Sequence, residues 1–242
     1  MHMHLHNPFV WLVAILAGGC ITVRAGSFTV QPVRIELSSK KLAVSAQIRN
    51  TSPDSTTIQA RVLAWRANGV EEVLTDNNEL LLNPPIFTLK PGQVQFMRVG
   101  LRRPPASSAE TTYRLILEET PPPPKAQFTG VTTLLKVSIP IFVNPSTTAP
   151  KLEWATERGQ GNKIRLHVEN RDTAHVQIKS ITVRGSDPGG KGFRKDAATN
   201  VLPGGLKEWV IEQDAVSGTG PLSVEATTDR GIVRAIVEPQ RR

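Results

Sequence analysis

Few side chains in this 242-residue chain are placed to do chemistry. His167 and His175 have no carboxylates around them at metal-ligand spacing, so the sequence predicts no metal site. Glu118 and Glu119 are neighbours on a predicted strand and therefore point to opposite faces, which excludes a paired acid–base site. No nucleophile elbow, phosphate loop or dinucleotide-binding motif is present. The sequence therefore predicts neither an enzyme nor a bound cofactor.

The first 25 residues are typical of an export signal. Pro8–Val23 is mostly apolar and uncharged but shorter than the roughly 20 apolar residues that a membrane span needs. Val23 and Ala25 supply small residues before a cleavage after Ala25. Cys20, the one cysteine, lies in this segment, so the mature chain would have no thiol. We expect residues 1–25 to be removed and the protein to be exported without stable membrane insertion.

The charge and composition narrow the classes of partner. The formal net charge is +8, and a basic surface suits a polyanion, an anionic lipid or an acidic protein. Aromatic residues make up only 5% of the chain, which argues against a surface that stacks nucleic-acid bases. We expect no nucleic-acid partner for an exported protein. The charge is also compatible with a diffusely basic surface that has no specific partner.

The elements after the leader are predicted to be strands. Short apolar segments of period two alternate with turn residues, and helical periodicity is almost absent. About seven strand regions precede Pro145, which is the strand count of an immunoglobulin-like sandwich. A linker at 144–150 leads to a second β pattern, in which Ser186–Asn200 is predicted to be a loop. The sequence therefore predicts an all-β protein with two immunoglobulin-like domains in series, at residues 26–146 and 147–242.

Gly130–Val143 is the longest predicted strand. Its odd positions are almost all apolar, whereas Lys136 and Ser138 lie at even positions. Pro140 cannot donate a ladder hydrogen bond, so part of the strand is expected at a sheet edge. A long apolar edge strand favours aggregation unless a partner covers it. Two interpretations are open: the odd residues face the core of their own domain, or some of them fill a groove on another protein by strand addition.

Several segments, taken together and in order, resemble the periplasmic chaperones of the chaperone–usher pilus pathway. These segments are Phe28–Ile35, Asn50–Ser52, Pro84–Gly92 followed by Arg98, Tyr113–Glu119 followed by prolines, and Ile139–Pro145. Each segment is short, but their order and spacing make the resemblance fairly specific from Ser27 to about Pro150. The rest of the chain matches the family only in outline.

The resemblance implies a fold and a mechanism. It implies two immunoglobulin-like domains set at an angle, with a cleft between them, and an action that needs neither ATP nor a cofactor. A pilin subunit of this pathway lacks its last strand; the chaperone lends its seventh strand, and an outer-membrane usher then exchanges it for the extension of the next subunit. The implied location is the periplasm, and the implied partners are pilin subunits and the usher. An exposed lending strand would also allow self-association.

The resemblance also assigns site residues. Five side chains of the lending strand are expected in the subunit groove: Val131, Thr133, Leu135, Val137 and Ile139. A cation is expected to hold the subunit's terminal carboxylate, and the candidates are Arg114 first, Arg34 second, and Lys136. The better-known branch of the family has a lysine where this chain has Pro140. This departure resembles the archaic or spore-coat-type branch, in which an arginine of the sixth strand would take that role.

The alternative is an exported adhesin or scaffolding protein made of two β-sandwiches. An adhesin would more often carry an exposed aromatic or polar recognition loop than a long apolar edge strand. A usher gene and pilin-like genes beside this one would favour the chaperone.

Overall fold

The computed structural model describes residues 27–106, 109–121, 133–146, 148–158, 161–185, 187, 191–216 and 220–240. The predicted signal peptide and Val131 lie outside the described residues. Within them, strands are joined by turns and by one 3-10 helix, η1 (Gln213–Ala215). The predicted all-β class is confirmed.

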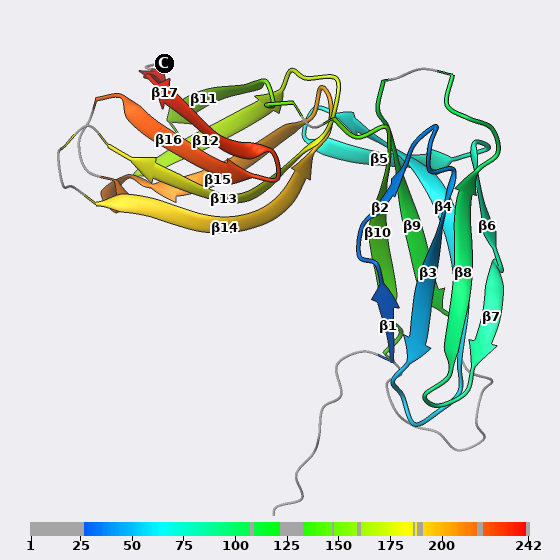
Figure 1. Cartoon of the computed structure of the whole chain (residues 1–242). Helices are drawn as coiled ribbons and strands as arrows, with labels where there is room; N and C mark the ends of the chain where they lie inside the picture. Colours follow the sequence, from blue (N-terminus) through cyan, green and yellow to red (C-terminus); the bar gives the residue numbers. More distant parts are fainter. Residues whose placement is uncertain are drawn as a thin grey trace, which may run out of the picture.

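The first ten strands form two facing sheets (Figure 1). Their bounds are β1 Phe28–Gln31, β2 Ile35–Leu37, β3 Ala43–Asn50, β4 Thr56–Asn68, β5 Glu71–Asp76, β6 Leu80–Asn83, β7 Ile86–Leu89, β8 Val94–Leu101, β9 Thr111–Glu119 and β10 Lys136–Val143. One sheet has the order β1-β3-β8-β6, and the other has the order β2-β10-β9-β4-β5, with β7 also paired to β4. Alternate side chains of both sheets, such as Ile48 and Leu115, pack into one core because successive residues of a strand point to opposite faces.

The predicted strand at Gly130–Val143 is longer than the observed one. Strand β10 begins at Lys136, residues 133–135 belong to no strand, and the 13-residue β4 is longer. Strand β10 pairs with β9 along its whole length but with β2 only at Ile141–Val143. The prediction that Pro140 marks an edge is therefore consistent with the pairing.

The remaining strands form a second pair of sheets. Their bounds are β11 Leu152–Arg158, β12 Lys163–Asn170, β13 Val176–Arg184, β14 Gly192–Val201, β15 Leu206–Glu212, β16 Leu222–Thr228, β17 Gly231–Val237 and β18 Pro239–Gln240. The sheet orders are β15-β12-β11-β18 and β14-β13-β16-β17, around a core of their own.

Two observed strands correct the sequence prediction. Strand β14 occupies most of the segment predicted as a loop, and β5 lies where no strand was predicted. Every residue of β5 is exposed, and most of β14 is at least partly exposed. Strands without a buried face lack the apolar alternation on which the prediction depends.

The two sandwiches share one buried asparagine motif. Asn50 Nδ2 donates to the backbone carbonyls of Asp54 and Leu89, at 2.8 and 3.0 Å. Asn170 Nδ2 donates to carbonyls 4 and 31 residues further on, at 2.9 and 2.8 Å. Each side-chain carbonyl accepts the backbone N–H two residues later. Both asparagines therefore satisfy buried backbone groups where β3 and β12 end.

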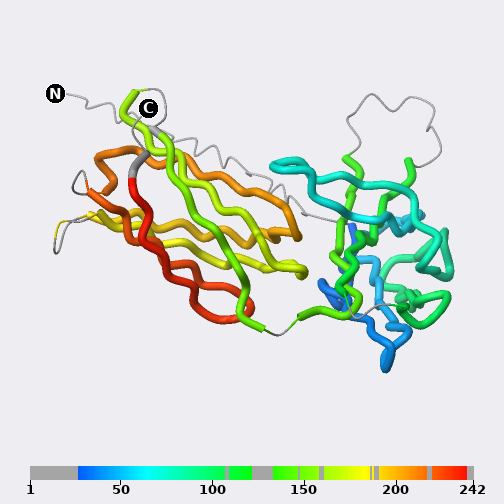
Figure 2. Tube along the Cα trace, turned by 90° about the horizontal axis from the view of Figure 1, so that it is seen from above, coloured from blue at the N-terminus to red at the C-terminus, as the bar shows by residue number. Residues whose placement is uncertain are grey.

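The β4–β5 hairpin connects the first sandwich to the second (Figures 1 and 2). Gly69, at its tip, forms a parallel bridge with Gly205, and the Leu206 N–H donates to the Gly69 carbonyl at 2.8 Å. A Cβ at Gly205 would lie 2.9 Å from both Ala67 Cβ and the Leu202 carbonyl oxygen. The two sandwiches, set at a steep angle in Figure 1, therefore meet closely enough to require glycine here.

Candidate functional site

A buried cluster joins the sandwiches at their corner. We call Trp65, Phe142 and Leu202 the corner cluster. Trp65 comes from β4 and Phe142 from β10, and their ring centroids lie 6.2 Å apart. Leu202 belongs to the second sandwich. All three are almost fully buried, so apolar packing between the sandwiches is concentrated at this corner.

Arg114, the first candidate anchor, lies on β9 beside the corner cluster. Its guanidinium carbon is 3.6 Å from the centroid of the Trp65 ring, a cation–π contact. Its Nη2 atom is 3.5 Å from Glu72 Oε2, and the Arg114 side chain is only 18% exposed. Burial lowers the pKa of the Arg114 guanidinium, although the Glu72 carboxylate acts in the opposite direction. Arginine remains charged under such conditions, so Arg114 is a largely desolvated cation.

Glu72 receives donors from both sandwiches. Lys207 Nζ lies 2.8 Å from Glu72 Oε1, and the Trp65 indole N–H donates to Oε2 at 2.8 Å. Partial burial raises the pKa of the Glu72 carboxyl, but the hydrogen bond and charge of Lys207, together with Arg114 and the indole, outweigh burial. The pKa therefore lies below its ordinary value. Lys207, Trp65 and Arg114 therefore form a carboxylate-binding site, and the Glu72 carboxylate occupies it.

Arg34, the second candidate, approaches the corner cluster through Phe142. Its guanidinium carbon lies 4.7 Å from the centroid of the Phe142 ring. Arg34 Nε donates to Glu36 at 2.7 Å, and Nη1 donates to Asp229 of the second sandwich at 3.0 Å. Arg34 thus has two carboxylate partners within this chain, whereas Arg114 has one among the described residues.

His175 links the sandwiches behind the same cluster. Its ring stacks on Phe142, with centroids 3.4 Å apart and planes inclined by 5°. Nδ1 lies 2.8 Å from Glu110 Oε2, and both side chains are at most 2% exposed. Nε2 is 3.8 Å from Asp229. These contacts give His175 a structural role between the sandwiches, and the structure places two carboxylates beside it that the sequence did not predict.

Lys136, the third candidate, does not lie in this cluster. Its Nζ atom is 2.5 Å from Glu118 Oε1, and its side chain is 60% exposed. The hydrogen bond from Lys136 lowers the pKa of the Glu118 carboxyl. The structure therefore brings Arg114 and Arg34 to the two aromatic rings of the corner cluster and leaves Lys136 at the opposite end of β10.

One edge of β10 is open over Lys136–Pro140. The Glu119 N–H donates to the Leu135 carbonyl, so odd-numbered residues exchange hydrogen bonds with β9. The backbone groups of even-numbered residues point away from β9, toward the side of β10 on which β2 lies. The Asn144 N–H, just after β10, shows this direction because it donates to the Leu37 carbonyl. Among the described strands, β2 covers that edge only at 141–143. The backbone groups of Lys136 and Ser138 therefore face an open edge.

The predicted groove-filling residues differ in exposure. Thr133 is exposed and precedes the strand, whereas Leu135 and Val137 are half-buried at the end of the first core. Ile139 is only 2% exposed and belongs to that core, where its side chain is not accessible to a partner. Val137, in the open part of β10, and Leu135, just before the strand, are thus apolar side chains on the core-facing side.

The sequence did not point to Glu72, Trp65 or Lys207 as site residues. Glu72 lies on a strand with no buried face, and Lys207 follows it by 135 residues. Their convergence depends on how the second sandwich sits on the first, which periodicity does not encode.

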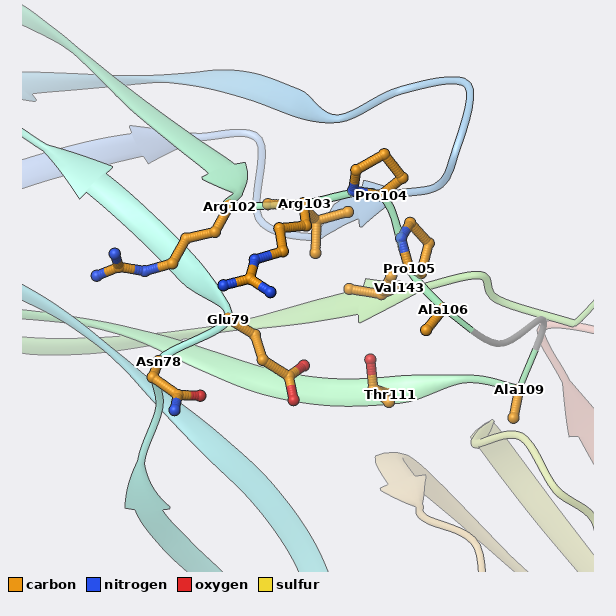
Figure 3. A pocket seen from close by; sticks show the side chains of 11 residues that line it. Asn78, Glu79, Arg102, Arg103, Pro104, Pro105, Ala106, Ala109, Thr111 and Val143 are labelled. Carbon is orange, nitrogen blue, oxygen red and sulfur yellow. The ribbon is translucent and has the colours of Figure 1, made fainter.

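A pocket of about 460 Å³ lies at the end of the first sandwich that faces the linker (Figure 3). It is lined by the Arg102–Ala106 segment and by Asn78, Glu79 and Thr111. The Tyr113 hydroxyl donates to the Glu79 carboxylate.

No described part of the chain holds a group of three side chains that could bind a metal ion. In the described residues, no helix has the length and apolar character to span a membrane.

Solved structures with a similar fold include a chaperone and two complexes of a chaperone with a pilus subunit. A chain of the CsuC–CsuE chaperone–tip adhesion subunit complex from archaic Csu pili of Acinetobacter baumannii is 19% identical, with a TM-score of 0.65, over 89% of this chain and 100% of that one. The Salmonella enterica SafA pilin–SafB chaperone complex matches with 18% identity and a TM-score of 0.58, over 88% of this chain and 97% of that one. The E. coli chaperone DraB matches with 17% identity and a TM-score of 0.54, over 88% of this chain and 97% of that one. No curated protein sequence matches the chain.

The sequence also matches a family profile over residues 27–149. That profile describes the pili and flagellar-assembly chaperones with the N-terminal domain of PapD. The matched residues cover both sheets of the first sandwich, including β9, β10 and the open edge between Lys136 and Pro140. The chain belongs to this family of pilus-assembly chaperones.

Proposed function

We propose that this chaperone captures pilin subunits in the periplasm by lending them β10. The open edge at Lys136–Pro140 is the observation that carries the proposal, because it presents unpaired backbone groups beside half-buried apolar side chains. A subunit that lacks a strand likewise has unpaired backbone groups and an exposed apolar groove. Pairing would satisfy backbone groups of both proteins and remove apolar surface from water.

Arg114 is the proposed anchor of the subunit's terminal carboxylate. Strand addition requires a fixed register, since a slip of one residue turns every side chain to the opposite face. A desolvated arginine at one end of the edge can set that register by holding both carboxylate oxygens. Arg114 fits this role better than Lys136, which is 60% exposed and lies at the other end of β10.

Leu135 and Val137 are the proposed groove-filling residues, extended by Thr133 and Val131 before the strand. Fully burying a Leu- or Val-sized side chain contributes about 1.5–3 kcal/mol before the costs of association. Several such contacts together are enough to hold a subunit while leaving the complex open to strand exchange. No ATP is needed, because the subunit's own folding provides the driving force.

The finer parts of the proposal concern processing and delivery. We infer a cleaved signal at residues 1–25, domains at 26–146 and 147–242, and delivery of the captured subunit to an outer-membrane usher. The CsuC–CsuE and SafA–SafB structures, each a chaperone with a pilus subunit, support a subunit as the partner. The same open edge would allow two free chaperones to associate.

Co-expression with a candidate pilin encoded beside this gene tests the proposed capture. The readout is co-purification from the periplasm with a His-tagged pilin. Val137→Asp places a charge among the groove-filling side chains and should reduce recovery at least tenfold. Val210→Asp, at a 54% exposed position on β15 of the second sandwich, is the matched control and should leave recovery unchanged. Circular dichroism establishes that both variants fold; full recovery of a folded Val137→Asp protein would contradict the proposal.

A further inference from the structure

The anchor proposed above already holds a carboxylate of its own chain. Glu72 Oε1 accepts a hydrogen bond from Lys207 at 2.8 Å. Glu72 Oε2 accepts the Trp65 indole N–H at 2.8 Å and lies 3.5 Å from Arg114 Nη2. A subunit's terminal carboxylate has the same charge and the same two oxygens, so it would compete with Glu72 for these donors.

Glu72 is held in a way that permits release. Its side chain is 37% exposed, and every residue of β5 is exposed. Arg114 is 18% exposed and Trp65 is fully buried, so these two donors stay fixed by the packing around them. Rotation of the Glu72 side chain into water would leave the pairing of β5 with β4 intact.

Charge balance favours an exchange over a simple departure of Glu72. Among the described residues, neither Arg114 nor Lys207 forms an ion pair with any other carboxylate. Loss of Glu72 alone would leave two partly buried cations without a counter-charge. Replacement by another carboxylate would keep both cations paired.

We propose that Glu72 is an internal surrogate for the subunit's terminal carboxylate. In the free chaperone it holds the Trp65–Arg114–Lys207 site, and the arriving carboxylate displaces it. Lys207 then becomes a second cation for the subunit, contributed by the second sandwich. This inference rests on the proposed role of Arg114 as the anchor. It makes Glu72 a specificity residue, since only a ligand with a free carboxylate can replace it fully.

Peptides that differ only at their C-terminus test the exchange. The probe is the C-terminal strand of a pilin encoded beside this gene, synthesised as the free acid and as the amide. Isothermal titration calorimetry gives both dissociation constants for each chaperone, and their ratio is the acid preference. Glu72→Gln removes the surrogate charge, and Glu71→Gln removes the same charge from the neighbouring exposed position.

We expect the wild-type chaperone and Glu71→Gln to share one acid preference. Glu72→Gln should bind the acid about two- to fivefold more tightly and raise the preference by a similar factor, the size expected for one partly exposed ion pair. Lys207→Met should lower the preference. A merely structural Glu72 predicts instead that Glu72→Gln weakens both peptides equally, and that result would overturn the proposal.

Arg114→Ala distinguishes a failure of the proposed anchor from a failure of the surrogate role of Glu72. If wild-type protein prefers the acid, Arg114→Ala abolishes this preference, and Glu72→Gln leaves it unchanged, then the anchor stands and the surrogate role is wrong. If wild-type protein shows no acid preference and Arg114→Ala binds both peptides as wild type does, then the anchor is wrong and the surrogate role with it.

Discussion

Pro140 of β10 lies directly opposite Arg114 of β9 in the antiparallel register. Paired residues of neighbouring strands share one face of the sheet, so the Arg114 side chain occupies the place beside position 140. In the better-known branch of the family, a lysine occupies the position of Pro140. Arg114 can therefore present a cation at an equivalent place from the neighbouring strand, which is compatible with the anchor proposed above.

Loss of the Arg114 guanidinium is expected to weaken subunit capture at least tenfold. Removing one partner of a desolvated charge pair typically costs about 2–5 kcal/mol. Arg114→Ala and Arg34→Ala would be compared by co-purification with a pilin and by thermal unfolding. Arg34→Ala should disturb the contact with Asp229 and act mainly on stability. Capture that is lost in Arg34→Ala but unchanged in Arg114→Ala would reverse this ranking, and capture unchanged in both would exclude either arginine as the anchor.

The single tyrosine of the chain makes one ionisation directly visible. Burial, together with the hydrogen bond and charge of Glu79, raises the pKa of Tyr113 to about 12. Because the folded pKa exceeds the unfolded value of about 10, the stability contributed by neutral Tyr113 is complete below pH 10 and is lost as the pH rises toward 12. Absorbance at 295 nm should show tyrosinate forming near pH 12 in native protein and near pH 10 in urea. A native midpoint at pH 10 would contradict the burial of Tyr113.

Each buried asparagine is expected to contribute more to the free energy of unfolding than one ordinary hydrogen bond does. Asn50→Ala and Asn170→Ala each leave two backbone carbonyls without their side-chain donor. Each unsatisfied buried group costs about 1–3 kcal/mol, so the two carbonyls together should cost each variant about 2–6 kcal/mol of unfolding free energy in urea. Asn→Asp at the same positions retains only the acceptor and should be as harmful. A loss below about 0.5 kcal/mol would show that water replaces the donor.

The contact between the sandwiches is expected to depend on Gly205. Gly205→Ala places a methyl group 2.9 Å from Ala67 Cβ and from the Leu202 carbonyl oxygen. Such overpacking typically costs about 1–3 kcal/mol, and it should widen the distribution of interdomain angles seen by small-angle X-ray scattering. Adding Ala67→Gly removes one of the two close atoms and should recover part of the loss. Equal stability of the wild type and Gly205→Ala would contradict the close contact.

Alternation of apolar residues was sufficient to predict the sandwiches but not every strand. The core strands β3 and β12 each bury one face, and their period-two pattern follows from that burial. Strand β5 has no buried residue, so nothing in its sequence favours a strand over a loop. The shared asparagine motif was likewise invisible, because Asn50 and Asn170 are equivalent only through carbonyls that the fold brings to them.

The surroundings of Arg114, the proposed anchor, could be predicted only in part for a similar reason. A strand pattern places Arg114 on the outer face, and the family resemblance gives it a role. Glu72 and Lys207 meet it through an interface between two sandwiches, where a single contact depends on the whole packing. Ile139 was expected to reach a partner, but β10 begins later than predicted and this part of it lies within the sandwich.

Amide hydrogen exchange of β10 tests the strand-lending account most directly. In the free protein, the Val137 and Ile139 N–H groups point to β9, whereas the Ser138 N–H points to the open edge. Free chaperone should therefore show slow exchange at 137 and 139 and fast exchange at 138. Binding of a pilin subunit should slow exchange at Ser138 at least a hundredfold and leave its two neighbours protected. A Ser138 amide that exchanges equally fast in the free chaperone and in the complex would contradict strand addition at this edge.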